Sequence, residues 1–194
     1  MTLAEVDASA QARTEYNLHR SVFLSMYTTH ILEFREEKDQ FFKLAPQSPI
    51  PEVDRGRFSG LSYFEPNEDY AFTVELDSVE PTDVQISTTT GDERTYRRVA
   101  TATMTVEGLD TTVALYSSGH EGLFLPFRDA TSGSETYGAG RYIDVTANED
   151  GTATIDFNYA YAPFCAYSDR YSCALPPQEN WMSVAIRAGE RNPD

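Results

Sequence analysis

The stretch TATMTVEGLDTTVALYS at residues 101–117 decides the fold class. Ala102, Met104 and Val106 are apolar, and threonines occupy the positions before each of them. Because successive side chains of a β-strand point to opposite faces, this alternation predicts a strand with one buried face. Glu-Gly-Leu-Asp at 107–110 has the composition of a turn, and apolar and β-branched residues resume after it. The stretch therefore predicts an antiparallel hairpin.

Similar runs, separated by turn residues such as those at 90–92 and 148–151, follow one another along most of the chain. Short strands at this spacing predict a mainly β fold, an antiparallel barrel or sandwich of about eight to ten strands. One long N-terminal helix is expected to pack against it, giving an α+β arrangement. The further runs lie near 58–64, 72–77, 83–88, 94–99, 122–128, 140–146, 152–158 and 182–188.

The N-terminal part has a different periodicity. Leu18, Val22 and Met26 recur every four residues, which predicts an amphipathic helix that ends before Pro46. Before this helix we expect a flexible acidic lead-in at 1–16. The rest is expected to form a single domain, 17–194, with the helix at 17–44, a β-rich body at 57–158, a packed segment rich in aromatics, proline and cysteine at 158–181, and a final strand at 182–188.

The charge balance restricts the classes of partner. The 194 residues include 31 acidic and 15 basic side chains, a formal net charge of −16, and only Lys38 and Lys43 are lysines. This excess of acid disfavours nucleic-acid binding, and no apolar run is long enough to predict a membrane span. Scarce lysine and abundant acid favour a cytosol of multimolar salt, where surface charges are strongly screened; an ordinary acidic protein is the alternative.

The N-terminal sequence and the cysteine content bear on localisation. The chain begins without a basic segment followed by an apolar one, so no secretory signal is visible. Two cysteines in 194 residues are too few for a disulfide framework. The sequence therefore predicts a cytoplasmic protein, of a halophilic organism if the salt interpretation holds.

The polar loop at 127–144 is the richest candidate for a site. It combines Arg128 and Arg141 with acidic, tyrosine and glycine residues between apolar strand positions. Because guanidinium groups bind carboxylate and phosphate well, the two arginines are candidate clamps for an anion. Glu135 is a candidate to orient them or to act as a general base. The alternative is an internal ion-pair network that braces a hairpin.

A second candidate segment carries both cysteines. Seven residues separate Cys165 from Cys173, whereas two to four are usual between zinc-ligand cysteines. A zinc site would need further ligands from His19, His30, His120 or a carboxylate. We therefore predict no metal site and no cofactor, with zinc at Cys165 and Cys173 as the less favoured alternative. Packed thiols or an occasional disulfide are favoured, and a thiol nucleophile would need a histidine partner.

These segments contain long motifs that resemble a known family. The sequence at 127–142 reads FRDATSGSETYGAGRY, that at 156–167 reads DFNYAYAPFCAY, and PPQEN follows at 176–180 and AGE at 188–190. Together they resemble the domain-of-unknown-function family numbered 1684, over nearly the whole chain from the helix onward. One departure is an alanine at position 162, where the family pattern favours asparagine.

The resemblance brings no activity, but it implies that the polar loop and the cysteine segment are hallmarks of the family. It therefore strengthens these positions as ligand-binding candidates. The candidate set is Arg128, Asp129, Glu135, Tyr137, Arg141, Asn158, Tyr167 and Glu179.

Three functions remain open from the sequence. The first is binding of a small anionic molecule in a pocket lined by Arg, Glu and Tyr, where the two hallmark segments converge. The second is a hydrolase or isomerase with Glu135 or Asp129 as general base; a carboxylate held in both oxygens by an arginine would instead favour bracing. The third is a structural or partner-binding module without a small-molecule site. The oligomeric state stays open.

Overall fold

The computed structural model describes residues 3–117 and 122–193, with side chains described from Leu24 onward. The chain divides into two compact units, Met1–Lys38 and Asp39–Asp194. The prediction of a single domain at 17–194, with the helix packed against it, stays a prediction.

Helix α1 spans Leu3–Leu44 and therefore begins earlier than the predicted start at residue 17. The segment expected as a flexible lead-in reads LAEVDASAQARTEY at 3–16. It is helical because alanine, leucine, glutamate, glutamine and arginine are good helix formers and no glycine or proline interrupts them. Its polarity suggested an unstructured end, but helix propensity depends on the backbone and on rotamer freedom more than on polarity.

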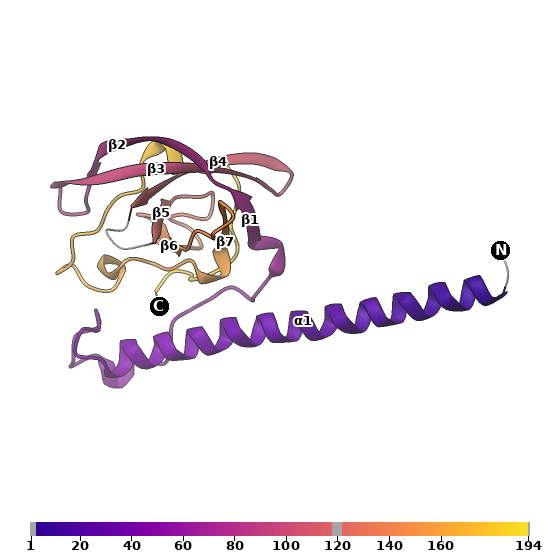
Figure 1. Cartoon of the computed structure of the whole chain (residues 1–194). Coiled ribbons are helices and arrows are strands. Elements are labelled where there is room, and N and C mark those ends of the chain that lie inside the picture. The colour runs from indigo at the N-terminus through magenta and orange to yellow at the C-terminus, as the bar shows by residue number, and fades with distance from the viewer. Residues whose placement is uncertain (1–2, 118–121, 194) are drawn as a thin grey trace. The chain divides into compact units, whose positions relative to one another are not determined.

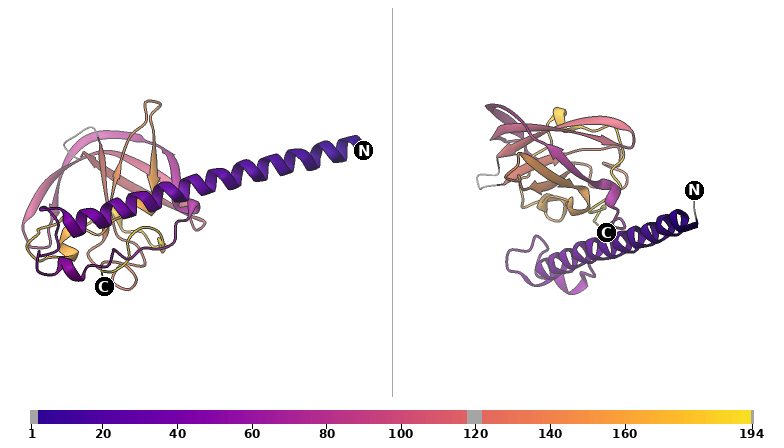
Figure 2. Two further views of the ribbon diagram at one scale, coloured as in Figure 1. Left: turned by 90° about the horizontal axis from the view of Figure 1, so that it is seen from below. Right: turned by 45° about the vertical axis from the view of Figure 1, so that its right-hand side comes forward.

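The second unit contains two antiparallel sheets, as Figures 1 and 2 show. In one of them strands β2 to β6 lie in sequence order; in the other, β1 pairs with β7. The bounds are β1 Ala71–Glu75, β2 Asp77–Ser87, β3 Glu93–Val106, β4 Leu109–Ser117, β5 Leu123–Phe127, β6 Arg141–Val145 and β7 Thr152–Asp156. Single turns of 3₁₀ helix are η1 Arg55–Arg57, η2 Glu68–Tyr70, η3 Phe157–Tyr159, η4 Phe164–Ala166 and η5 Gln178–Asn180.

The mainly β, antiparallel prediction is confirmed, and the sheets form a sandwich-like arrangement that is not closed into a barrel. Within the described ranges the chain forms seven strands, fewer than expected. One reason is that the runs near 94–99 and 101–106 belong to the single long strand β3, which carries a register shift between Arg98 and Ala100. Such a bulge interrupts the side-chain alternation without ending the strand.

The prediction of a final strand at 182–188 is wrong. Met182, Val184, Ile186 and Ala188 are buried in alternation, so the segment has the pattern of a strand. Its backbone groups, however, bond to a loop and to side chains in place of a neighbouring strand. The run at 58–64 likewise forms no regular strand.

The core lies on both faces of the five-stranded sheet. Val113 and Leu115 of β4 belong to the main hydrophobic cluster, which includes Val74 and Ile155 of the small sheet. The alternate residue Tyr116 belongs to a second cluster on the opposite face, which the C-terminal segment helps to form. Because both faces of the sheet are covered, residues 113–116 are all buried, and no exposed residue alternates with them.

Candidate functional site

Arg141, expected as an anion clamp, lies inside the protein with an exposed fraction of 1%. Its guanidinium donates to the carbonyl oxygens of Ile186 at 2.8 Å, Glu190 at 3.0 Å and Ala188 at 2.5 Å. It also lies 3.6 Å from the Asp129 carboxylate. Burial lowers the pKa of Arg141, while the charges of Asp129 and Glu190 oppose that shift. Through these bonds the side chain holds the C-terminal segment in place.

The carboxylate of Asp129, a candidate general base, is likewise bonded to the protein's own groups. Its Oδ2 accepts the N–H of Ile186 at 2.7 Å and the hydroxyl of Thr131 at 2.7 Å. Its Oδ1 accepts the hydroxyl of Ser132 at 3.1 Å. A buried carboxylate with these partners stabilises the fold and offers no free oxygen pair to a substrate. We call Asp129, Arg141 and the backbone of 186–190 the bracing network.

Glu135, the other candidate base, forms a two-point ion pair with Arg187. The Arg187 Nη2 donates to Oε1 at 2.8 Å, and Nε donates to Oε1 at 3.0 Å and Oε2 at 3.1 Å. These hydrogen bonds hold the pKa of Glu135 below its ordinary value. A carboxylate that is ionised and engaged in this way matches the bracing alternative, not a general base with a raised pKa.

The remaining polar candidates do not converge on one pocket. The Arg128 guanidinium lies 5.0 Å from the centre of the Trp181 ring. Glu179 accepts from Arg98 at 2.8 Å and from the hydroxyl of Tyr116. Asn158 is fully buried, and its side chain accepts from and donates to the backbone of Asn67 at 2.9 and 2.8 Å. These three side chains each tie the fold together at a different place.

The two cysteines are free thiols and lie together. The N–H of Cys165 donates to Sγ of Cys173 at 3.4 Å, and the Tyr137 hydroxyl lies 3.8 Å from Sγ of Cys165. Hydrogen bonds from Cys173 and then from Tyr137 lower the pKa of Cys165 to about 6, whereas the same contact raises the pKa of Cys173. In the described part of the chain no three metal-ligating side chains gather. His120 lies outside the described residues, as does the side chain of His19.

A cleft with aromatic walls lies on the outer face of the five-stranded sheet, next to the cysteines. Its volume is about 490 Å³. The polar groups that line it are two serines, the Cys173 thiol and the carboxylate of Asp144, which accepts the Tyr161 hydroxyl at 3.0 Å. Pro163 and six aromatic residues provide the rest of the wall; the aromatic residues are Tyr96, Phe124, Tyr142, Tyr161, Phe164 and Tyr171. We call this hollow the aromatic cleft.

Two neighbouring pairs of rings in the aromatic cleft meet at steep angles, and a third pair is stacked. The Phe124 and Tyr142 rings are 4.8 Å apart at 72°, and those of Tyr142 and Tyr161 are 5.7 Å apart at 88°. Tyr96 stacks on Phe124 at 5.7 Å. Burial raises the pKa of Tyr142 and Tyr161, so both stay neutral phenols. The described lining contains no Arg or Lys.

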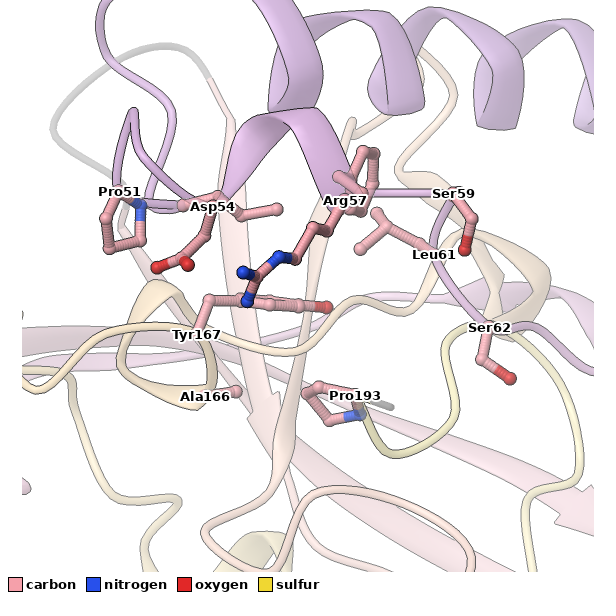
Figure 3. A pocket seen from close by; sticks show the side chains of 12 residues that line it. Pro51, Asp54, Arg57, Ser59, Leu61, Ser62, Ala166, Tyr167 and Pro193 are labelled. Carbon is pink, nitrogen blue, oxygen red and sulfur yellow. The ribbon is translucent and has the colours of Figure 1, made fainter.

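A second cavity, of about 360 Å³, lies between residues 50–62 and the Tyr167 region. Figure 3 shows the Arg57 side chain reaching toward Tyr167, with Ser59 and Ser62 to one side and Asp54 to the other. Arg57 forms no ion pair within the described residues, although Asp54 lines the same cavity. The Tyr167 hydroxyl donates to Glu190 at 2.8 Å. We call this hollow the Arg57 pocket.

Comparison with known proteins identifies the family. The sequence pattern of the protein family of unknown function DUF1684 matches residues 56–191. The chain belongs to DUF1684. It is similar to the solution NMR structure of an uncharacterised protein from Haloarcula marismortui, at 40% sequence identity and a TM-score of 0.67, over 87% of this chain and 95% of that one. No curated protein matches the chain.

Several DUF1684 motif residues are structural in this chain. Asn180 of the PPQEN motif bonds through its side chain to both the N–H (2.7 Å) and C=O (2.9 Å) of Ala114, and to the C=O of Pro126 at 2.8 Å. It thus takes the place of a neighbouring strand where proline lacks an N–H. Glu190 of the AGE motif is buried and accepts from Ala162 and Tyr167, each at 2.8 Å.

Close packing also explains why glycine stands at two of the motif positions. A Cβ at Gly189, where φ is +74°, would lie 2.5 Å from the carbonyl oxygen of Ala160; one at Gly140, where φ is +103°, would lie 2.6 Å from that of Phe127. Sequence reasoning did not single out Asn180, Glu190 or these glycines as bracing residues. A signal was available only for Glu190, a carboxylate directly after Ala188 and Gly189, which indicates a satisfied buried group. Asn180 follows Gln178 and Glu179 and had no such signal.

The DUF1684 chain contains, in the ranges 3–117 and 122–193, no helix that is both long and apolar enough to span a bilayer.

Proposed function

We propose that the protein binds a small organic cation, such as an alkylammonium, in the aromatic cleft. The observation that carries this proposal is a hollow of about 490 Å³ walled by six aromatic side chains, with one carboxylate and no basic residue in its described lining. Ligand sites are typically concave and mainly apolar, with a few polar groups that fix orientation.

The chemistry of the walls favours a positive ligand over a negative one. The face of an aromatic ring attracts a cation by about 0.5–2 kcal/mol, and several rings at steep angles present such faces from different directions. Asp144 supplies a formal negative charge at the rim, where its side chain is exposed. The net charge of −16 adds to the attraction of cations, although multimolar salt would shorten its range.

The test is a calorimetric titration with tetramethylammonium chloride, at a constant total chloride concentration. Tyr161→Leu keeps an apolar side chain but removes a ring face, and should weaken binding at least about ten-fold, whereas Tyr161→Phe keeps the face and should retain most of it. Asp144→Asn should weaken binding about two- to ten-fold. Asp83→Asn, at an exposed position of β2, is the matched control with the same change of charge. No binding to the wild type, or equal loss in Asp83→Asn, would contradict the proposal.

A second candidate function keeps the anionic ligand expected from the sequence and assigns it to the Arg57 pocket. The specific support is the Arg57 guanidinium, which has no ion pair among the described residues and lies in a cavity with two serine hydroxyls. Inorganic phosphate is the probe. Arg57→Gln should abolish phosphate binding and Arg97→Gln, an exposed arginine of β3, should not. Equal affinities in both variants would exclude this site.

Localisation stays part of the proposal. We infer a cytoplasmic protein adapted to high salt, supported by the acidic, lysine-poor composition and by the similarity to a protein of Haloarcula marismortui. The expected sign is a melting temperature that rises as KCl is increased from about 0.1 M into the multimolar range, because salt screens the repulsion among carboxylates. A falling melting temperature would contradict the salt adaptation.

The hydrolase or isomerase alternative has less support, because both candidate bases are engaged by the protein's own groups. A structural or partner-binding module is the interpretation that follows if neither tetramethylammonium nor phosphate binds.

A further inference from the structure

We propose that Cys165 and Cys173 form a reactive dithiol that exchanges with small disulfides at the edge of the aromatic cleft. Cys165 is the attacking thiol and Cys173 the resolving one. This activity does not depend on whether the cleft holds a cation.

The first argument is that the two cysteines are held in contact. Sγ of Cys173 accepts the N–H of Cys165 at 3.4 Å. Cys173 is fixed in turn by Thr89, which accepts its N–H at 3.1 Å through the hydroxyl and donates its own N–H to the Cys173 carbonyl at 2.9 Å. Cys165 is the middle residue of η4, and this turn begins directly after the buried Pro163. The backbone therefore keeps a second thiol beside the first, as a resolving step requires.

The second argument is that the surroundings distinguish the two sulfurs. The Tyr137 hydroxyl lies 3.8 Å from Sγ of Cys165, so that a thiolate there gains a hydrogen bond. No comparable hydroxyl contact to Sγ of Cys173 is found in the described residues. The positive charge of Arg94 lowers the pKa of Cys173, but the hydrogen bond with Cys165 and burial outweigh it and raise that pKa. The charges of both sulfurs contribute to the raised pKa of Tyr142. Asp92 accepts a hydrogen bond from the hydroxyl of Ser172, the residue before Cys173. The lowered pKa of Cys165, about 6, agrees with this asymmetry.

The third argument is access. Both cysteines are half-buried, neither sealed in the core nor fully exposed. Cys173 is part of the cleft lining, and the cleft volume of about 490 Å³ is of the size that takes small organic molecules. Cys165 does not line the cleft, and its own half-buried position gives the access that an attacking thiol needs. A small aromatic disulfide can therefore reach the pair beside the cleft, where the tyrosine rings next to Cys173 provide an apolar wall.

The reaction balances as a thiol–disulfide exchange. The Cys165 thiolate attacks one sulfur of RS–SR, an S–S bond forms between protein and reagent, and RS⁻ leaves and takes up a proton from water. Cys173 then loses its proton to water and attacks Sγ of Cys165, which releases the second RS⁻. Two protein thiols are oxidised to one disulfide, and one small disulfide is reduced to two thiols.

The experiment uses 4,4′-dithiodipyridine on the full chain, which contains two cysteines. Wild type should release two equivalents of thiopyridone and carry an internal disulfide without bound reagent, as intact mass shows. Cys173→Ser should release one equivalent and keep a mixed disulfide. Cys165→Ser should react at least about ten-fold more slowly than Cys173→Ser near pH 7. Far-UV circular dichroism of each variant verifies folding.

Two results would overturn the proposal. One is a wild type that ends with two mixed disulfides, because the sulfurs would then not reach each other. The other is equal rates in the two serine variants. As a further readout, Tyr137→Phe should move the pH midpoint of Cys165 alkylation upward from about 6, because the thiolate loses a donor. An unchanged midpoint would remove Tyr137 from the account.

Discussion

The polar loop at 127–144 and the aromatic cleft use their functional groups in opposite ways. In the loop, Arg141 and Asp129 are buried and bond to the protein's own backbone. In the cleft, the aromatic side chains and the Asp144 carboxylate line a cavity. The comparison teaches that a dense polar motif in a sequence can serve to hold the backbone together. Aromatic residues scattered along the sequence can instead form the cavity that is open to a ligand.

Removal of Arg141 should give the largest effect. Arg141→Met leaves the Asp129 carboxylate buried without its cation and three carbonyl groups without a donor. Loss of one partner from such a pair costs about 3–5 kcal/mol in the free energy of unfolding, a large part of a typical domain's stability. Urea unfolding followed by circular dichroism measures it. A cost below about 1 kcal/mol would mean that the loop is not a brace.

Gly189→Ala should come next. The substitution meets the carbonyl oxygens of Ala160 and Phe157 at 2.5 and 2.6 Å and adds strain at a φ of +74°. We expect a loss of about 3 kcal/mol. Gly91→Ala is the matched control, because its φ is +87° but nothing lies within 4 Å of the added Cβ, and it should cost about 1 kcal/mol. Equal losses would show that strain alone matters and that the tight approach at 189 does not.

The exposed ion pair of Glu135 and Arg187 should have the smallest effect. Because hydrogen bonds from Arg187 lower the pKa of Glu135, the pair's contribution is present above the ordinary carboxyl pKa of 4.5 and is lost as pH falls through the lowered value. Arg187→Gln should therefore lower the melting temperature slightly near pH 7 and not at all in strong acid. Thermal unfolding over a pH series measures it; a larger effect in acid would contradict the assignment.

Part of this fold follows from the sequence in simple terms. The alternation at 101–117 predicts the hairpin of β3 and β4 because burial on one face forces a period of two. The same signal misleads at 182–188, where alternate side chains are buried but the backbone partners are Asp129, Arg128 and Arg141. Periodicity reports burial, and it does not report what the backbone bonds to.

The candidate site in the aromatic cleft is harder to predict because its parts are distant in the chain. The cleft combines Tyr96, Phe124 and Tyr161, which only the sheet order and the return of the C-terminal segment bring together. The polar candidates failed to converge for a related reason. A sequence shows that Arg141 is an arginine but not that it lies within the core, where its two terminal nitrogens donate to backbone carbonyl groups.

The most direct test of this contrast between the polar loop and the aromatic cleft is a ¹H–¹⁵N NMR titration of the wild-type protein with tetramethylammonium chloride. The account predicts progressive shifts at amides of the aromatic cleft, among them those of Phe124, Tyr142 and Tyr161, with the loop amides at 128–140 unchanged. Shifts centred on the polar loop, or none in the cleft at saturating cation, would contradict it.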